Sequence, residues 1–208
     1  MLSEQVVTAI SDAVAAMSFW ELGAVVLALA YLILAMRENS LCWYAAFFST
    51  SIYVFLFWDV SLLMESALQI FYLVMAVYGW WQWRNSGDEQ QDLRIHRWSL
   101  RTHLLVAAVV GVLTLVFGYV LHTSTHAALP YLDSFTTWGA VITTYMVTRK
   151  VLENWIYWIV IDGASVYLYI DRGLYLTALL FVIYVVLVVI GFFQWYAIYK
   201  REQLASQS

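Results

Sequence analysis

The sequence predicts an all-α integral membrane protein with seven transmembrane helices, arranged as two parallel three-helix repeats joined by a linker helix. Three observations carry this prediction: the composition, a series of long apolar runs, and an internal repeat. Of the 208 residues, 63% are hydrophobic and only 12% are charged. A soluble domain is about half apolar and about a quarter charged, so the water-soluble classes are excluded.

Seven apolar runs have about the length that a membrane-spanning helix needs. Each run is continuous rather than alternating, which favours helices over the strands of an outer-membrane barrel. Residues 3–17, ahead of the first run, show an amphipathic helical spacing that suits the membrane interface. The runs lie at 19–36, 41–58, 61–83, 102–121, 131–148, 154–170 and 173–198.

The distribution of Lys and Arg predicts the orientation of the chain. When seven spans are threaded, all but one of the ten Lys and Arg residues fall on the same side. Cytoplasmic loops carry the excess of positive charge, so we expect the N-terminus outside and the C-terminus in the cytoplasm. Arg172 falls on the outer side. The cytoplasmic set is Arg37, Arg84, Arg94, Arg97, Arg101, Arg149, Lys150, Lys200 and Arg201.

An internal repeat links the two halves of the chain. Gly23–Val26 recurs as Gly139–Ile142, Glu38-Asn39 with Trp43 as Glu153-Asn154 with Trp158, and Gly79–Trp83 as Gly191–Trp195. The fourth span between the copies restores the direction of the chain, so both copies share one orientation, a plan known from transporters. The predicted parts are an N-terminal amphipathic helix (1–18), the first repeat (19–83), a basic loop with linker helix and outer loop (84–130), the second repeat (131–199) and a cytoplasmic tail (200–208).

Polar side chains inside the apolar runs are candidate binding residues, because a central charge costs about 2.5–3.5 kcal/mol on insertion scales. Asp162 shares a helical face with Asn154 and Trp158. Glu65 lies on a similar stripe of the third run. Aromatic faces attract cations, and amides and a carboxylate complement them, so the pattern suits a flat, polar, cationic solute. The first face also carries Ser165 and Tyr169, the stripe of the third run carries Gln69, Tyr72, Trp80 and Trp83, and a stripe of the second run carries Asn39, Trp43, Thr50 and Tyr53.

Structural explanations stand beside these assignments. Asn and Gln in membrane helices often bond to neighbouring helices, and Trp and Tyr at span ends often anchor the interface; the latter is our interpretation of Trp20, Trp98, Trp195 and Tyr199. His122 and His126 have no third ligand near them, and the lone Cys42 excludes an intrachain disulfide. We therefore expect no metal, no cofactor and no nucleic-acid partner, and the absence of a Gly-rich phosphate loop disfavours an ATP-driven pump.

The chain resembles the PnuC family of bacterial vitamin transporters over residues 18–198. The resemblance rests on Glu153–Asp162, Tyr167 and Gly191–Trp195, and on Tyr78–Trp83 at the end of the third run. By position, Asn154, Trp155, Trp158 and Asp162 match the motif of the sixth span, and Trp80 and Trp83 match that of the third. Trp155 thereby joins the candidate substrate-binding residues.

The resemblance implies uptake of nicotinamide riboside across the bacterial inner membrane by facilitated diffusion. A separate intracellular kinase would then trap the solute by phosphorylation. It also implies an architecture like that of SWEET sugar transporters and a homotrimer in the lipid bilayer. Sister groups carry thiamine or riboflavin, and the pocket chemistry does not separate nicotinamide riboside from thiamine.

Two other classes of function remain open on the sequence. One is a small membrane enzyme that uses Glu65 and Asp162 as an acid/base pair, and the other is a membrane subunit or receptor that binds without transporting. Proton coupling through these carboxyl groups is also open.

Overall fold

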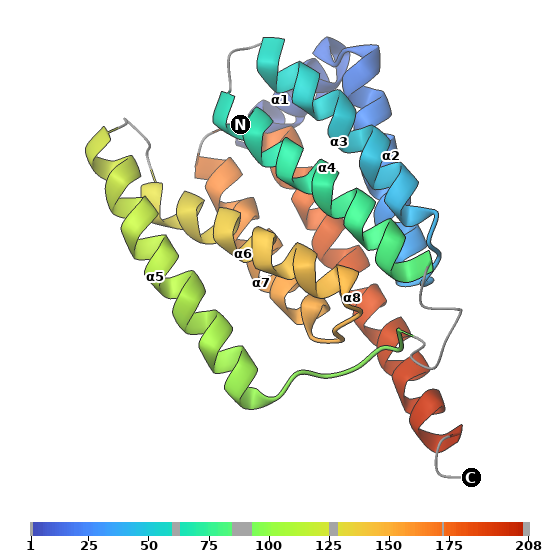
Figure 1. Cartoon of the computed structure of the whole chain (residues 1–208). Coiled ribbons are helices and arrows are strands. Elements are labelled where there is room, and N and C mark those ends of the chain that lie inside the picture. The colour runs from blue at the N-terminus through green and yellow to red at the C-terminus, as the bar shows by residue number, and fades with distance from the viewer. Residues whose placement is uncertain (1, 60–62, 85–92, 125–128, 172, 206–208) are drawn as a thin grey trace. The chain divides into compact units, whose positions relative to one another are not determined.

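The computed structural model describes residues 2–59, 63–84, 93–124, 129–171 and 173–205, and in these ranges the chain forms eight α-helices and no β-strand (Figure 1). An all-helical chain is what the continuous apolar runs predicted. The helices are α1 (Leu2–Ala16), α2 (Phe19–Met36), α3 (Cys42–Asp59), α4 (Leu63–Arg84), α5 (Leu100–Ser124), α6 (Pro130–Thr148), α7 (Asn154–Asp171) and α8 (Tyr175–Ala205).

Each of the seven apolar runs forms one of the helices α2–α8. A helix is expected there because the backbone polar groups of a segment in a hydrocarbon environment must bond within that segment. The largest difference lies at the end of α8, which continues to Ala205 through the segment predicted as a tail. A side-chain bond within the last turns supports this extension: Gln203 Nε2 donates to Tyr199 Oη at 2.6 Å.

Three helices in the described part of the chain are long and apolar enough to cross a membrane, judged by length and composition. They are α2, α5 and α8, and α3 contributes a shorter apolar stretch, Cys42–Leu56. The helices α4, α6 and α7 carry more polar side chains, among them Gln69, Thr143 and Asp162. The polar candidates of the sequence therefore lie on the less apolar helices.

The chain divides into two compact units. Unit 1 comprises residues 1–15, 97–143 and 153–189, and unit 2 comprises residues 16–96, 144–152 and 190–208. The units follow spatial contacts, whereas the boundaries at 18, 83, 130 and 199 follow the sequence repeat, and those boundaries stay a prediction.

Unit 2 is built around α3, which packs against both α2 and α4. Ser49 Oγ on α3 donates to the carbonyl of Ala24 on α2 at 2.8 Å. Trp195 on α8 is fully buried in this unit. Our interpretation of Trp195 as an interface anchor was therefore wrong. Its indole is enclosed by protein, and the indole N–H donates to the carbonyl of Ala35 at 3.1 Å.

Two turns of unit 2 have the same backbone geometry. After α2, Glu38 adopts φ 51° and the N–H of Asn39 donates to the carbonyl of Leu34 at 3.0 Å. After α6, Lys150 adopts φ 52° and the N–H of Val151 donates to the carbonyl of Met146 at 3.0 Å. Both are Schellman ends, in which a left-handed residue closes the helix.

These matching turns align the two halves differently from the sequence comparison. Glu38 corresponds to Lys150, and the first residue of α3, Cys42, corresponds to Asn154 of α7. Counted from these turns, Trp43 takes the place of Trp155, whereas the sequence pairs it with Trp158; the repeat itself stays a prediction. The sequence comparison aligned the two copies on the Glu-Asn pairs at 38–39 and 153–154. The structural comparison aligns them on the left-handed residue of each turn, Glu38 and Lys150.

In unit 1, α5 and α6 approach closely where a glycine removes a side chain. A Cβ on Gly118 of α5 would lie 2.4 Å from the ring of Tyr131 on α6. Next to it, the rings of Phe117 and Trp138 lie 4.9 Å apart. Farther along α6, a Cβ on Gly139 would lie 3.0 Å from Ile161 of α7.

Candidate functional site

The nine predicted binding residues fall into two groups, one in each compact unit. Unit 2 holds Asn39, Trp43, Gln69, Tyr72 and Trp80, and unit 1 holds Asn154, Trp155, Trp158 and Asp162. Glu65, which the sequence placed on the same stripe as Gln69, lies in α4, but its side chain is outside the described residues. Arg172 and His126 are outside them too.

Trp43 is the centre of an aromatic cluster in unit 2. Its side chain is 2% exposed, and its ring lies 5.9 Å from that of Tyr31 on α2 and 5.3 Å from that of Trp83 on α4, the latter edge to face. A Cβ added to Gly79 would lie 2.4 Å from the indole, so the ring rests directly on the backbone of α4. Only glycine permits this approach.

The indole N–H of Trp43 is buried and has no hydrogen-bond partner among the described residues. A buried donor without a partner costs free energy comparable to a lost hydrogen bond. Such a donor in an aromatic cluster is suited to a carbonyl or hydroxyl oxygen of a solute.

The residues of α4 lie at two levels along the helix. Gln69 and Tyr72 are half-buried in its middle. Trp80 lies about 16 Å from Gln69 along the axis, at 1.5 Å per residue. Trp80 contacts Tyr44 with ring centroids 6.2 Å apart, and the Arg84 guanidinium lies 5.3 Å from its ring. The structure therefore places Trp80 level with the Trp43 cluster and away from Gln69.

Asn39 has a local role in the turn before α3. Its Oδ1 accepts the N–H of Leu41 at 2.9 Å, and its backbone carbonyl accepts the N–H of Cys42 at 3.0 Å. Asn is favoured in such turns because its side chain bonds to its own backbone two residues on.

On α7 the predicted polar face is the face that is turned inward. Asn154, Asp162 and Ser165 are buried, and Trp158 is half-buried. Trp155, one residue along, is 1% exposed. Ser165 Oγ donates to the carbonyl of Ile161 at 2.9 Å. The hydrogen bonds and ion pairs found among the described residues include none to the carboxylate of Asp162, which is 4% exposed.

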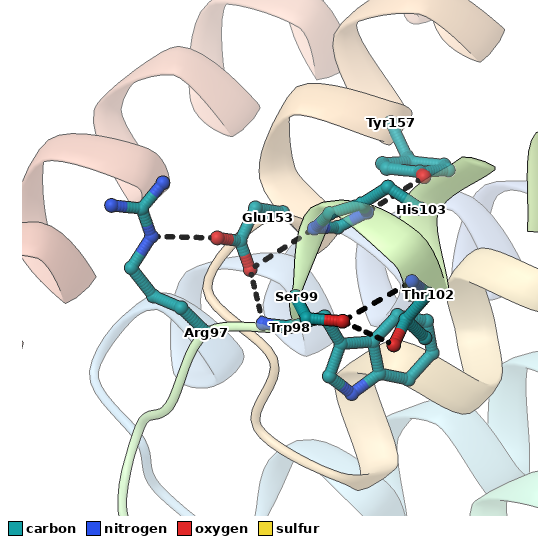
Figure 2. A network of polar contacts seen from close by, with 7 residues as sticks. All are labelled: Arg97, Trp98, Ser99, Thr102, His103, Glu153 and Tyr157. Carbon is teal, nitrogen blue, oxygen red and sulfur yellow. Dashed lines mark hydrogen bonds and ion pairs between the residues drawn. The ribbon is translucent and has the colours of Figure 1, made fainter.

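A polar network holds the first residue of α7 in place (Figure 2). Glu153, which directly precedes Asn154, is buried, and its carboxylate accepts from Arg97 Nε at 2.7 Å and from the N–H of Trp98 at 3.3 Å. His103 on α5 lies with Nε2 3.9 Å from this carboxylate and with Nδ1 2.9 Å from the hydroxyl of Tyr157. Ser99 and Thr102 bond to each other at the start of α5.

The sequence prediction did not include these network residues as a site. Glu153 was visible as part of the internal repeat, and His103 is a titratable residue at the start of an apolar run. Their meeting depends on a separation of 50 residues along the chain, which no local pattern reveals.

Among the described residues, no group of three or more His, Cys, Asp or Glu side chains is placed to hold a metal ion. The candidate residues offer aromatic faces, amide groups, the buried indoles of Trp43 and Trp155, and the buried carboxyl group of Asp162.

Residues 18–197 match the sequence model of the family described as nicotinamide mononucleotide transporter. The chain is 26% identical over 181 residues to the riboflavin/roseoflavin transporter RibM of Streptomyces davaonensis, covering 85% of this chain and 84% of RibM. It is 24% identical over 188 residues to the nicotinamide riboside transporter PnuC of Escherichia coli, covering 78% of each.

One solved structure shares the fold. A crystal structure of the vitamin B3 transporter PnuC matches with a TM-score of 0.71 over 96% of this chain and 92% of that one, at 22% identity.

Proposed function

This chain belongs to the nicotinamide mononucleotide transporter family, and from this premise we propose that it carries nicotinamide riboside across the bacterial inner membrane. The family consists of multi-pass membrane transporters rather than enzymes, which removes the acid/base enzyme from the alternatives.

The proposed architecture has seven spans, with α2–α4 and α6–α8 as parallel repeats and α5 as the linker. The matching Schellman turns at Glu38 and Lys150 support the repeat. In this arrangement the N-terminus lies outside and the C-terminus in the cytoplasm, and the two repeats give alternating access to the solute. The positive charge at the ends of the spans supports this orientation.

The observation that carries the proposed substrate is the buried carboxylate of Asp162 on the inward face of α7. A charged group in the membrane interior is costly and marks a solute path by default. Nicotinamide riboside contains a pyridinium cation, which a carboxylate and aromatic rings both stabilise. Asp162 would offset that charge.

The remaining candidates have roles that follow from their chemistry. Asn154 and Gln69 address the carboxamide or the ribose, and Asn39 does so through its amide group, since its oxygen is engaged in the turn. Tyr72, Trp155 and Trp158 stack on the pyridinium ring. Trp43 and Trp80, which lie at one level and away from Gln69 along α4, line the route that the solute takes.

A nucleoside suits the chain better than a nucleotide. The seven apolar runs contain none of the ten Lys and Arg residues of the sequence. A phosphate group entering the membrane would therefore meet no cation to pair with, and an unpaired buried charge is strongly disfavoured. We accordingly expect nicotinamide mononucleotide to be excluded.

The rest of the proposal concerns energetics and assembly. Transport is facilitated diffusion, a separate kinase traps the nucleoside by phosphorylation, and the functional unit is a homotrimer. The kinase and the trimer follow from the family resemblance alone.

Riboflavin is the second candidate, favoured by the 26% identity to RibM over 85% of this chain. Its tricyclic ring is flat and suits the aromatic residues, but it is uncharged and gains nothing from Asp162. The carboxylate therefore separates the two candidates.

Calorimetry on the purified protein tests the proposal, with nicotinamide riboside, riboflavin, thiamine and nicotinamide mononucleotide titrated in parallel. We expect heat from nicotinamide riboside alone, followed by its counterflow in proteoliposomes. Heat from riboflavin or thiamine instead would transfer the protein to a sister group. Binding without flux would identify a receptor and refute the transport proposal.

A further inference from the structure

Two indole N–H groups in unit 2 close helix ends that belong to opposite repeats. Trp83 near the end of α4 donates to the carbonyl of Thr148, the last residue of α6, at 3.2 Å. Trp195 on α8 donates to the carbonyl of Ala35 near the end of α2 at 3.1 Å. The two bonds are reciprocal: the third helix of each repeat bonds to the end of the first helix of the other.

These bonds lie in a dry environment. The exposed fraction is 0% for Trp195 and Thr148, 1% for Ala35 and 9% for Trp83. The two indole rings also lie 6.2 Å apart. Carbonyls in the last turn of a helix lack a complete set of intrahelical partners, and at a buried carbonyl no water replaces a lost indole N–H. The Ala35 carbonyl also accepts the N–H of Glu38 at 3.0 Å, so losing the indole leaves it one partner fewer rather than none.

An ion pair joins the turns beside these bonds. Lys150 Nζ lies 2.8 Å from Glu38 Oε2, and the ammonium also lies 4.9 Å from the ring of Trp83. Both residues have left-handed backbones, with φ of 52° and 51°. Glycine is the usual residue at this position of a helix end. Both turns instead carry a side chain with a steric cost, and the two side chains have opposite charges and form an ion pair.

We propose that these four side chains form a lock that closes the cytoplasmic end of the transport path, an inference that rests on the proposed function. The lock consists of Trp83, Trp195, Glu38 and Lys150. Arg37, Arg84 and Arg149 lie next to it in the sequence, and positive charge marks the cytoplasmic side. Solute leaves into the cytoplasm when the two indole bonds and the ion pair break together.

This assignment separates opening from recognition. The lock residues set how often the cytoplasmic end opens, whereas solute recognition belongs to residues such as Asp162 in unit 1. Removing one bond of the lock lowers the equilibrium constant between the closed and the open state by the factor that this bond contributes, and the open fraction rises by the same factor.

Cys42 is a natural reporter for opening. It is the single cysteine of the sequence and is fully buried. It begins α3, directly after the turn that carries Glu38. A maleimide reagent reaches its thiol only when this turn separates from its neighbours, so the labelling rate follows the open fraction.

The test compares labelling rates of the purified full-length protein without any solute. Trp83→Phe and Trp195→Phe each keep an aromatic ring and remove one N–H donor. One net hydrogen bond corresponds to a factor of roughly five, so each variant should label about fivefold faster than the wild type. Trp81→Phe is the matched control on α4, because Trp81 is 51% exposed, and it should label at the wild-type rate.

The ion pair supplies an independent arm of the test. Glu38→Lys places two ammonium groups together and should accelerate labelling, and adding Lys150→Glu should restore most of the wild-type rate. Such a rescue distinguishes a specific pair from a general loss of packing, because both variants carry a substitution at the same strained turn.

Two results would overturn the lock: labelling of both Trp variants at the rate of Trp81→Phe, or acceleration that only parallels a fall in unfolding temperature and is not rescued by the charge swap. In inside-out membrane vesicles, an impermeant maleimide should label Cys42, and labelling only from the outer side would refute the assignment to the cytoplasmic end. Because labelling needs no solute, a lock that opens as expected while calorimetry fails with every vitamin would refute the proposed substrate and not the lock.

Discussion

Gly79→Ala is the substitution whose effect the structure defines most closely. The new methyl carbon would lie 2.4 Å from Cζ2 and 2.5 Å from both Cε2 and Cη2 of the Trp43 indole. These distances are about 1 Å shorter than an ordinary carbon–carbon contact. The indole is 2% exposed and is enclosed by Tyr31 and Trp83, so it has no open space to move into.

Overpacking of this kind costs about 1–3 kcal/mol, partly offset by about 0.5–1 kcal/mol from replacing glycine within a helix. We therefore expect Gly79→Ala to lower the free energy of unfolding by about 1–2 kcal/mol, measured by denaturant unfolding in detergent. Gly111→Ala on α5 is the matched control, because a Cβ there meets nothing within 4 Å. It should be neutral or slightly stabilising.

A double-variant cycle tests whether the indole is the cause. In the background of Trp43→Leu the clashing ring atoms are gone, so Gly79→Ala should cost much less than in the wild type. An equal cost in both backgrounds, or no cost at Gly79 in the wild type, would refute this account of how Trp43 packs.

Three further predictions follow from the described contacts. Asp162→Asn should weaken binding of nicotinamide riboside about tenfold by calorimetry, since a desolvated charge pair is lost. Asp171→Asn at the exposed end of α7 is its control, and intact nicotinamide riboside binding to Asp162→Asn would refute the charge role. Arg97→Ala should lower the free energy of unfolding by less than about 1 kcal/mol, because the Arg97 side chain is 59% exposed. Glu153→Ala should lower it by about 1–3 kcal/mol, because its part-buried N–H partners lose their acceptor. Equal losses in denaturant unfolding would refute the view that the buried carboxylate contributes more than its ion pair with Arg97. Gly118→Ala should cost less than Gly79→Ala, because the clashing Tyr131 is 41% exposed and its ring has room to turn away.

The positions of the helices were accessible from the sequence because one physical requirement sets them. A helix of about 20 apolar residues satisfies its own backbone hydrogen bonds and matches the thickness of the hydrocarbon core of a bilayer. For this reason α2, α3 and α6 begin and end within a residue or two of the predicted runs. The end of α8 was not accessible in this way, because its last turns leave the apolar run and are held by polar contacts such as that between Gln203 and Tyr199.

The candidate site was only partly accessible. Helical periodicity identified the inward face of α7 with Asn154 and Asp162, because an expensive polar group is kept from lipid. It did not reveal that Trp80 lies level with the Trp43 cluster, which the packing of α3 against α4 decides, nor that Asn39 uses its oxygen in a turn.

The sequence by itself determined the class of the molecule, the helices and the polar face of α7 that is turned inward, because these depend on composition and local period. Only the tertiary structure decided the equivalence of Glu38 with Lys150, the burial of Trp195 and the network around Glu153. Each of these joins segments far apart in the chain. Such contacts depend on which carbonyl or carboxylate a side chain reaches in space, and no pattern along the sequence encodes that distance.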